Sequence, residues 1–373
     1  METPFAISIL QLLHDYLSAP YPLPYSNERS IFLAQRCIDD LSSLNYQPGF
    51  YTRSLIERQW DSLDTTKKLS LVLQRYRYDF INEKKIDPDV GSLYPVVAQI
   101  EITSRCNYRC QFCYQTDTTF SSKDSPFQGD ILLEDWFTLI DEANEAIPFL
   151  IIASRGEPTL HPHFSEILSY AQGKFLDFKI NTNASLLNDV SILSILECCT
   201  TVHFSIDSAD PSDYALLRVN GDFRNVVKRI KRFNELRDIH PRNSIVRTHA
   251  SGVNFRPDLQ DEDLYKSQLQ DLVDGASFVP YTPWNSSYSN LTNEIVVPCN
   301  LLALQQYVWF DGTYGACDID YKNNLISTNN KIDLLSGQGL LHAWKSPELS
   351  ALRAAHVDGD RQKLTPCSGC TYV

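Results

Sequence analysis

The sequence contains no uninterrupted apolar run of the roughly 18 residues that a membrane-spanning helix needs. Its first residues lack the basic segment of a secretory signal peptide, and Gln11 and His14 interrupt the apolar stretch that follows. Positive charge is scarce, because 33 lysines and arginines stand against 46 aspartates and glutamates, for a net charge of -13. Nucleic acids and anionic membranes would repel such a chain on average. We therefore expect a cytoplasmic protein that binds neither nucleic acid nor membrane.

Internal repeats and low-complexity tracts are also absent, and the remaining composition is that of a globular protein, with 43% hydrophobic and 21% charged residues. A length of 373 residues predicts two or three domains. The chain has ten cysteines. Because the cytosol keeps thiols reduced, we do not expect them to form disulfides; clustered thiols there more often bind metal or take part in chemistry.

The apolar residues change their spacing along the chain. Up to about residue 89 they recur every three or four positions, which predicts helices, most clearly over 29–44 and 63–82. From Tyr94 onward, short apolar runs alternate with amphipathic stretches. The predicted strands are 96–103, 147–153, 175–180, 201–207, 245–253 and 276–279, and the clearest helices between them are 134–146, 164–173, 187–197, 225–239 and 261–273.

Repeated strand–helix units of this kind predict an α/β fold, a partial (β/α)6 TIM-like barrel with a parallel sheet and outer helices. In such barrels the functional side chains gather at the carboxyl ends of the strands. After about Leu291 the pattern is irregular and rich in cysteine. We divide the chain into a helical segment of unknown role (1–94), the barrel (95–292) and a small cysteine-rich domain (293–373).

A first cysteine set, Cys106, Cys110 and Cys113, has the spacing CxxxCxxC and directly follows the first predicted barrel strand. A structural zinc site would normally need a fourth protein ligand, and ferredoxin loops are spaced differently. Three thiolates on one cluster would leave one iron open. The segment resembles the radical S-adenosylmethionine (SAM) superfamily, whose motif CxxxCxΦC has an aromatic residue where this chain has Phe112. Three incidental thiols or a zinc loop are the alternatives.

The resemblance implies that the three cysteines hold a [4Fe-4S] cluster whose open iron binds SAM through its amino and carboxylate groups. Reductive cleavage of SAM would then give a 5'-deoxyadenosyl radical that takes a hydrogen atom from a substrate. It also implies a one-electron donor such as flavodoxin or ferredoxin.

Residues 154–162 follow the second predicted strand and resemble the superfamily's GGEP motif. Gly156, Glu157 and Pro158 match this motif, which implies that they help to hold the SAM amino group. Arg155 replaces the first glycine. We therefore predict that Arg155 reaches a substrate or a carboxylate and counts as a catalytic residue.

Polar side chains also follow the later strands. Asn183, Ser205 and Asp207 stand where the superfamily keeps contacts to the ribose and carboxylate of SAM, although Ser205 and Asp207 could equally cap the helix that begins near Pro211. Arg247 is a further candidate for the SAM carboxylate.

A second cysteine set, Cys299, Cys317, Cys367 and Cys370, is typical of a zinc ribbon or a complete iron–sulfur cluster. A tight turn at Asp311 and Gly312 predicts a hairpin before Cys317. This part resembles the SPASM/twitch domains of radical SAM enzymes, in their shorter form, and so implies one auxiliary [4Fe-4S] cluster. The other thiols, Cys37, Cys198 and Cys199, are expected to be buried packing residues.

Together these resemblances favour an oxidoreductase that removes hydrogen from a polar small molecule, such as a sugar or an aminocyclitol, and passes an electron to the auxiliary cluster. Aromatic side chains at Tyr281, Trp284 and Tyr288 could contact a sugar ring or form an apolar lid. Maturation of a ribosomally made peptide is the second hypothesis. A zinc-stabilised binding protein without enzymatic activity is the third.

Overall fold

A computed structural model describes residues 4–23, 30–83, 94–153, 155–326, 331–332 and 339–372. The predicted helical stretch extends to about residue 89, and its part from residue 84 onward lies outside the described residues. None of the helices in these ranges combines the length and the apolar character that crossing a membrane requires.

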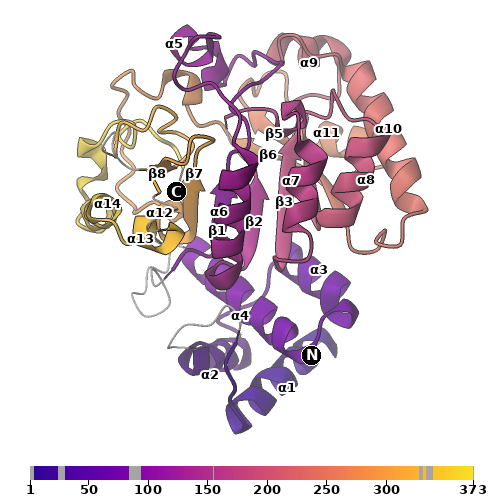
Figure 1. Cartoon of the computed structure of the whole chain (residues 1–373), viewed down its shortest axis with the longest axis vertical. Coiled ribbons are helices and arrows are strands. Elements are labelled where there is room, and N and C mark those ends of the chain that lie inside the picture. Colours follow the sequence, from indigo (N-terminus) through magenta and orange to yellow (C-terminus); the bar gives the residue numbers. More distant parts are fainter. Residues whose placement is uncertain are drawn as a thin grey trace.

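The N-terminal segment is helical, as predicted, and forms the lower lobe in Figure 1. It comprises α1 (Pro4–Ser18), α2 (Ser30–Ser42), α3 (Phe50–Gln59), the short η1 (Trp60–Ser62) and α4 (Thr65–Asn82). Asp64 caps α4 by accepting a hydrogen bond from the Lys67 amide at 2.8 Å. The apolar faces of these helices share one core with Val97 and Phe149 at the starts of two strands, so the lobe covers the amino end of the sheet.

The middle of the chain forms the predicted partial barrel. Its six parallel strands are β1 (Val97–Ile100), β2 (Phe149–Ile152), β3 (Asp177–Thr182), β4 (Thr201–Ser205), β5 (Arg247–Asn254) and β6 (Ala276–Pro280), hydrogen-bonded in that order. Between them run α6 (Leu133–Ala146), α7 (Phe164–Ala171), α8 (Asp189–Cys198), α9 (Pro211–Leu217), α10 (Phe223–Asp238) and α11 (Glu262–Leu269). Short turns of helix lie in the loops as η2 (Tyr114–Thr116), α5 (Thr118–Ser121), η3 (Pro158–Leu160) and η4 (Trp284–Ser286).

Side chains alternate along the strands between the helical layer and the lumen of the barrel. In β3 and β4 the residues facing the helices, such as Ile180 and Val202, are fully buried in the main core. The alternate residues Lys179, Asn181 and His203 are half-buried, because they line cavities inside the barrel. The lumen is therefore polar while the outer face of the sheet is apolar.

The C-terminal segment continues the same sheet. After α12 (Leu301–Leu304), β7 (Gln305–Val308) pairs in parallel with β1, and β8 (Tyr314–Gly315) pairs antiparallel with β7. Gly312 has a φ of 78° in the turn between them, as the predicted hairpin requires. The segment ends with α13 (Leu340–Trp344), α14 (Pro347–Val357) and η5 (Asp360–Lys363). The hairpin prediction is confirmed, and the structure adds that this hairpin extends the barrel's own sheet.

Candidate active site

The first cysteine set lies in the loop that follows β1, at the carboxyl end of the sheet. Cys106, Cys110 and Cys113 all line one cavity of about 370 Å³. Backbone hydrogen bonds from Arg109 to Val219 at 3.0 Å and from Gln111 to Leu217 at 3.1 Å hold this loop against the end of α9. The fold thus presents all three thiols to the same space.

Burial raises the pKa of the Cys106 thiol to about 12 and that of Cys110 to about 11. The Arg218 guanidinium, whose Nη1 lies 3.8 Å from Cys110 Sγ, acts in the opposite direction. Buried thiols of this kind lose their protons when they bind metal, because the metal stabilises the thiolate.

Within the described residues, no three cysteine, histidine, aspartate or glutamate side chains are gathered around the place of a single metal ion. A [4Fe-4S] cluster makes a different demand, because each thiolate binds its own iron atom and the sulfur ligands stand further apart than around one ion. Three thiols on one cavity wall fit such a cluster with one iron left open to the cavity.

The loop after β2 packs directly against the cysteine loop. A Cβ atom on Gly156 would lie 2.2 Å from the Thr103 carbonyl oxygen, so only glycine permits this approach. The buried Glu157 carboxylate accepts hydrogen bonds from Thr182 Oγ1 at 2.6 Å and from the Asn183 amide at 2.7 Å. Burial raises the pKa of Glu157, and these hydrogen bonds oppose that rise. Pro158 begins η3 directly after Glu157.

Phe112, Asn183 and Ser205 line the same cavity as the cysteines, together with Gly156 and Glu157. Asn183 Nδ2 also donates a hydrogen bond to Asn107 Oδ1 at 2.9 Å, which ties the end of β3 to the cysteine loop. The structure therefore brings together most of the residues that the sequence predicted for SAM binding. Ser154, the first residue of the predicted motif, lies outside the described residues.

Asp207 does not line this cavity, which corrects its predicted role as a direct SAM contact. Its fully buried carboxylate forms an ion pair with Arg218 and accepts a hydrogen bond from the Val253 amide at 2.6 Å. Arg218 in turn lines the cavity. Asp207 therefore positions a cation, whereas the cap of α9 is Asp210, which accepts hydrogen bonds from the Ser212 and Asp213 amides.

Sequence reasoning missed Arg218, although it lies beside a cysteine of the first set. An arginine that follows the last residue of a helix is usually exposed to solvent. Arg218 differs because it pairs with the buried Asp207. The signal in the sequence was Asp207, an acidic residue at a strand end for which a partner had to be found.

Comparison with known proteins identifies the domain that carries this cavity. Residues 100–247 match the model of the radical SAM superfamily. The chain carries a radical SAM domain. This match supports the predicted superfamily, its enzyme class and its cofactors, SAM and [4Fe-4S] clusters.

Two curated relatives illustrate the similarity. The chain is 30% identical over 111 residues to the tungsten-containing aldehyde ferredoxin oxidoreductase cofactor-modifying protein of Pyrococcus furiosus, over 29% of this chain and 30% of that protein. It is 28% identical over 138 residues to the mycofactocin maturase MftC of Mycobacterium ulcerans, over 37% of this chain and 36% of that protein. The chain thus matches about a third of the length of these relatives.

Among solved structures, Streptococcus suis SuiB bound to its precursor peptide SuiA superposes with a TM-score of 0.55. The superposition covers 88% of this chain and 84% of SuiB at 14% identity. At this identity the likeness concerns the fold, and it supports the predicted α/β barrel.

Arg247 lies outside the SAM-binding end of the radical SAM domain, which corrects another prediction. It is the first residue of β5 and therefore stands at the amino end of the parallel sheet. Its Nη1 donates a hydrogen bond to Ser54 Oγ of α3 at 2.7 Å. At the carboxyl end of the same strand, Ser251 and Val253 line the cysteine cavity instead.

Arg155 has a buried side chain, and its guanidinium already has several partners. Nε donates to Glu101 Oε2 at 2.7 Å and Nη1 to the Tyr321 carbonyl oxygen at 2.9 Å. The guanidinium also lies over the Trp309 ring, 4.1 Å from its centroid. These contacts tie the barrel to the C-terminal segment and show that Arg155 reaches a carboxylate, as predicted. Arg155 also lines the cysteine cavity, and its catalytic role stays a prediction.

The second cysteine set gathers in the C-terminal segment. Cys299, Cys317, Cys367 and Cys370 line one apolar cavity, together with His356 of α14 and Arg361 of η5. Burial raises the pKa of the Cys299 thiol to about 11. Four thiols around one space fit a [4Fe-4S] cluster better than one zinc ion, because no three of the described thiols are gathered around a single ion.

Two buried N–H groups beside these thiols favour the larger, anionic group. His356 Nδ1 accepts a hydrogen bond from the Cys299 amide at 3.2 Å, so the ring hydrogen is on Nε2. Neither His356 Nε2 nor Arg361 Nε has a hydrogen-bond partner among the residues that the structure describes. Sulfides and thiolates of an iron–sulfur cluster would accept hydrogen bonds from both.

Proposed function

We propose that this protein is a radical SAM oxidoreductase that removes hydrogen from a carbon of a polar small molecule. The observation that carries the proposal is the single cavity at the carboxyl ends of the strands. There the three thiols, the Glu157 and Arg218 side chains and the polar lumen of the barrel face the same space. When bound, the cluster and SAM supply the 5'-deoxyadenosyl radical.

The residues of the chain would divide the work as follows. Cys106, Cys110 and Cys113 hold the cluster, and Glu157 with its hydrogen-bonded neighbours faces the SAM amino group. Arg218 offers a fixed cation to the SAM carboxylate, because Asp207 holds it beside Cys110. Asn183 and Ser205 supply polar contacts to the ribose.

Oxidation of a hydroxyl-bearing carbon would proceed by loss of one hydrogen atom to the deoxyadenosyl radical, followed by loss of one proton and one electron from the substrate radical. We propose that the second cysteine set holds the auxiliary cluster that takes this electron. Flavodoxin or ferredoxin would supply the separate electron that cleaves SAM. In this proposal the barrel (95–292) carries the SAM chemistry and the C-terminal segment (293–373) holds the auxiliary cluster. The helical segment (1–94) has no assigned role in these steps.

The lining of the lumen supports a polar substrate. Gln99, Lys179, Asn181 and His203 face the same cavity as the first cysteine set. Of the three aromatic candidates for contact with a sugar ring, Trp284 lines this cavity, whereas Tyr288 packs against Tyr321 and donates a hydrogen bond to Asp320 at 2.9 Å.

Iron analysis after anaerobic reconstitution tests this proposal. Two [4Fe-4S] sites predict about eight iron atoms per chain, and a triple alanine variant of Cys106, Cys110 and Cys113 should retain about four. The wild type should also form 5'-deoxyadenosine with a chemical reductant. Zinc in place of iron, or no iron lost in the variant, would overturn the proposal.

Peptide maturation is a second candidate, which the similarity to a mycofactocin maturase favours. Deuterated sugars and deuterated candidate precursor peptides can be compared as sources of label in 5'-deoxyadenosine. Label that comes only from a peptide would replace the small-molecule proposal with this one.

A further inference from the structure

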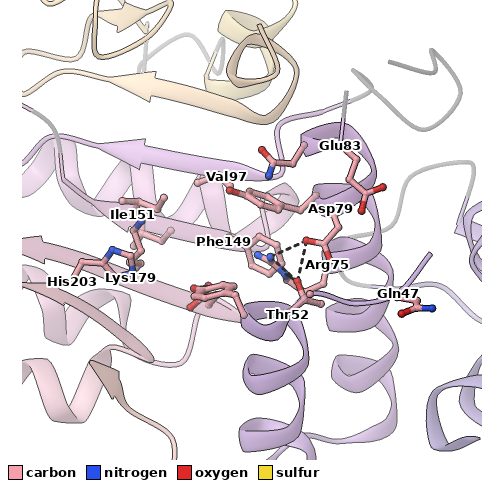
Figure 2. A pocket seen from close by; sticks show the side chains of 16 residues that line it. Gln47, Thr52, Arg75, Asp79, Glu83, Val97, Phe149, Ile151, Lys179 and His203 are labelled. Atoms are coloured by element: carbon pink, nitrogen blue, oxygen red, sulfur yellow. Dashed lines mark hydrogen bonds and ion pairs between the residues drawn. The ribbon is translucent and has the colours of Figure 1, made fainter. Parts of the chain in front are cut away.

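A second cavity, of about 450 Å³, lies at the opposite end of the barrel, where the N-terminal helices cover the amino ends of the strands. Figure 2 shows its lining. Phe149 and Lys179 come from the sheet, and Thr52 and Arg75 come from α3 and α4. Asp177 of β3 and Tyr51 of α3 also line the cavity. We call it the far cavity. The N-terminal lobe thus closes a space inside the barrel that the strands alone would leave open.

Lys179 and His203 line both the far cavity and the cysteine cavity. Figure 2 shows them beside each other at the sheet side of the far cavity, away from Glu83. They belong to the neighbouring strands β3 and β4 and face the lumen. These two side chains therefore mark the place where the two cavities meet, which we call the waist.

The other charged groups of the far cavity already have partners. Arg75 donates a hydrogen bond to Thr52 Oγ1 at 2.9 Å and forms an ion pair with Asp79 at 3.2 Å. Asp177 accepts hydrogen bonds from Tyr51 at 2.9 Å and Thr200 at 2.5 Å. Arg75 and Asp177 therefore already interact with other residues of the protein.

Lys179 differs from these groups, because it makes no hydrogen bond and no ion pair with any residue in the described ranges. Burial lowers the pKa of Lys179, and the nearby carboxylates of Asp177 and Asp318 act in the opposite direction. Asp318 accepts hydrogen bonds from Gln99 at 2.8 Å. A half-buried ammonium group without a direct partner is costly, and an anion that reached it would be bound strongly.

His203 completes the waist. Burial and the neighbouring Lys179 lower its pKa well below the usual value, so the ring is neutral. A neutral imidazole still offers one N–H donor. An ammonium and an imidazole N–H that face the same space can bind the oxygen atoms of one carboxylate or phosphate group.

We propose that Lys179 and His203 bind an anionic group of the substrate, a carboxylate or a phosphate, at the waist of the barrel. The proposal rests on the proposed function and narrows its substrate class to an acidic sugar, in place of a cationic aminocyclitol. Asn181 follows Lys179 by two residues along β3 and is the register partner of His203, on the side of Lys179 that leads toward the cysteine loop. A sugar ring extending from the waist would therefore present its carbons at the cysteine cavity.

Calorimetric titration of the reconstituted holoenzyme with glucuronate and with glucose 6-phosphate tests the proposal and distinguishes the two anions. Glucose and glucosamine serve as the neutral and cationic probes. At least one acidic sugar should bind more tightly than either of them. Lys179→Met should weaken its binding by about tenfold or more, while Lys179→Arg should retain most of it. Lys228→Met, on the exposed face of α10, is the matched control and should bind like the wild type.

Equal binding of the acidic sugar to the wild type and to Lys179→Met would overturn the proposal. So would tighter binding of glucosamine than of both acidic sugars, or the binding of neither acid. His203→Ala should reproduce part of the loss, which makes the test independent of whether the lysine variant folds. Iron content and SAM cleavage of the wild type, measured in parallel, report on the proposed function alone. Their presence without binding of an acidic sugar would reject only the anion site.

Discussion

At the scale of single residues, Gly156 shows how tightly the cavity is built. A side chain there would meet the backbone at Thr103 and Arg105. We expect Gly156→Ala to push the cysteine loop away from the loop after β2, with a cost of about 1–3 kcal/mol and a lower iron content after reconstitution. Gly49→Ala is the control, because a Cβ atom added at Gly49 would have no other atom within 4 Å. Thermal unfolding and iron analysis should separate the two variants; equal iron content would contradict the expectation.

Asp207 acts through Arg218, the arginine with which it forms a buried ion pair. Asp207→Asn removes the charge that holds Arg218, and loss of one partner of a buried ion pair costs about 3–5 kcal/mol. We expect weaker SAM binding, by about tenfold or more, because Arg218 would no longer be fixed beside Cys110. Equilibrium dialysis with SAM would measure this, with the exposed Asp238→Asn as control. Unchanged affinity would remove Arg218 from the proposed SAM site.

His249 predicts a pH dependence of stability. Burial, followed by the neighbouring Arg247 and Lys179, lowers its pKa from the ordinary histidine value of 6.5 to about 4. The unfolded chain therefore binds the proton more readily, so the contribution of His249 is complete above pH 6.5 and is lost as the pH falls toward 4. Denaturant unfolding of the wild type and of His249→Gln at about pH 7.5, 6 and 5, which span this window, should show a smaller loss in the variant. Identical losses would mean that His249 does not contribute.

At the scale of helices and strands, local sequence patterns predicted most of the architecture. The six barrel strands and the five clearest helices occur close to their predicted positions, because each has its own apolar periodicity. Helix α3 lies within the stretch that was predicted to be helical but was not located individually, since its apolar residues are few and charged residues interrupt them. Arg247 was assigned to the SAM carboxylate by resemblance, although the predicted strand 245–253 already placed it near the amino end.

Helix α14 supplies a residue that should tune the auxiliary cluster. The His356 ring donates from Nε2 only, because Nδ1 accepts from Cys299, and hydrogen bonds to a cluster favour its reduced, more negative state. We expect His356→Phe to lower the midpoint potential of the second cluster. His356→Gln, which keeps an N–H donor, should partly restore it. An EPR-monitored redox titration of the reconstituted chain measures both, and an unshifted potential in the Phe variant would contradict the assignment.

At the scale of the whole molecule, the contacts between distant segments were beyond sequence reasoning. Spacing identified both cysteine sets, because ligands of one cluster leave a local pattern. It could not show that β7 pairs with β1, that Arg155 reaches Tyr321, or that the N-terminal helices enclose a cavity under the barrel. Such contacts depend on which surfaces meet after folding. The domain boundaries at 94/95 and 292/293 stay predictions.

The ion pair of Arg155 and Glu101 offers a test of how the barrel and the C-terminal segment are joined. Both side chains are almost completely buried, and Arg155 also reaches the Tyr321 carbonyl oxygen. Arg155→Met would leave the Glu101 carboxylate buried without its partner, at a cost of about 3–5 kcal/mol. Glu101→Met/Arg155→Met removes both charges and should lose less stability than the sum of the two single variants.

Denaturant unfolding of the wild type, the two single variants and the double variant measures this coupling. Limited proteolysis shows where the structure loosens. If Arg155 joins the two segments, Arg155→Met should be cut faster within 293–373, while the barrel remains resistant. Additive losses of stability would mean that Arg155 and Glu101 are not coupled. An unchanged cleavage pattern would mean that the sheet pairing of β7 with β1 holds the segments together without help from Arg155.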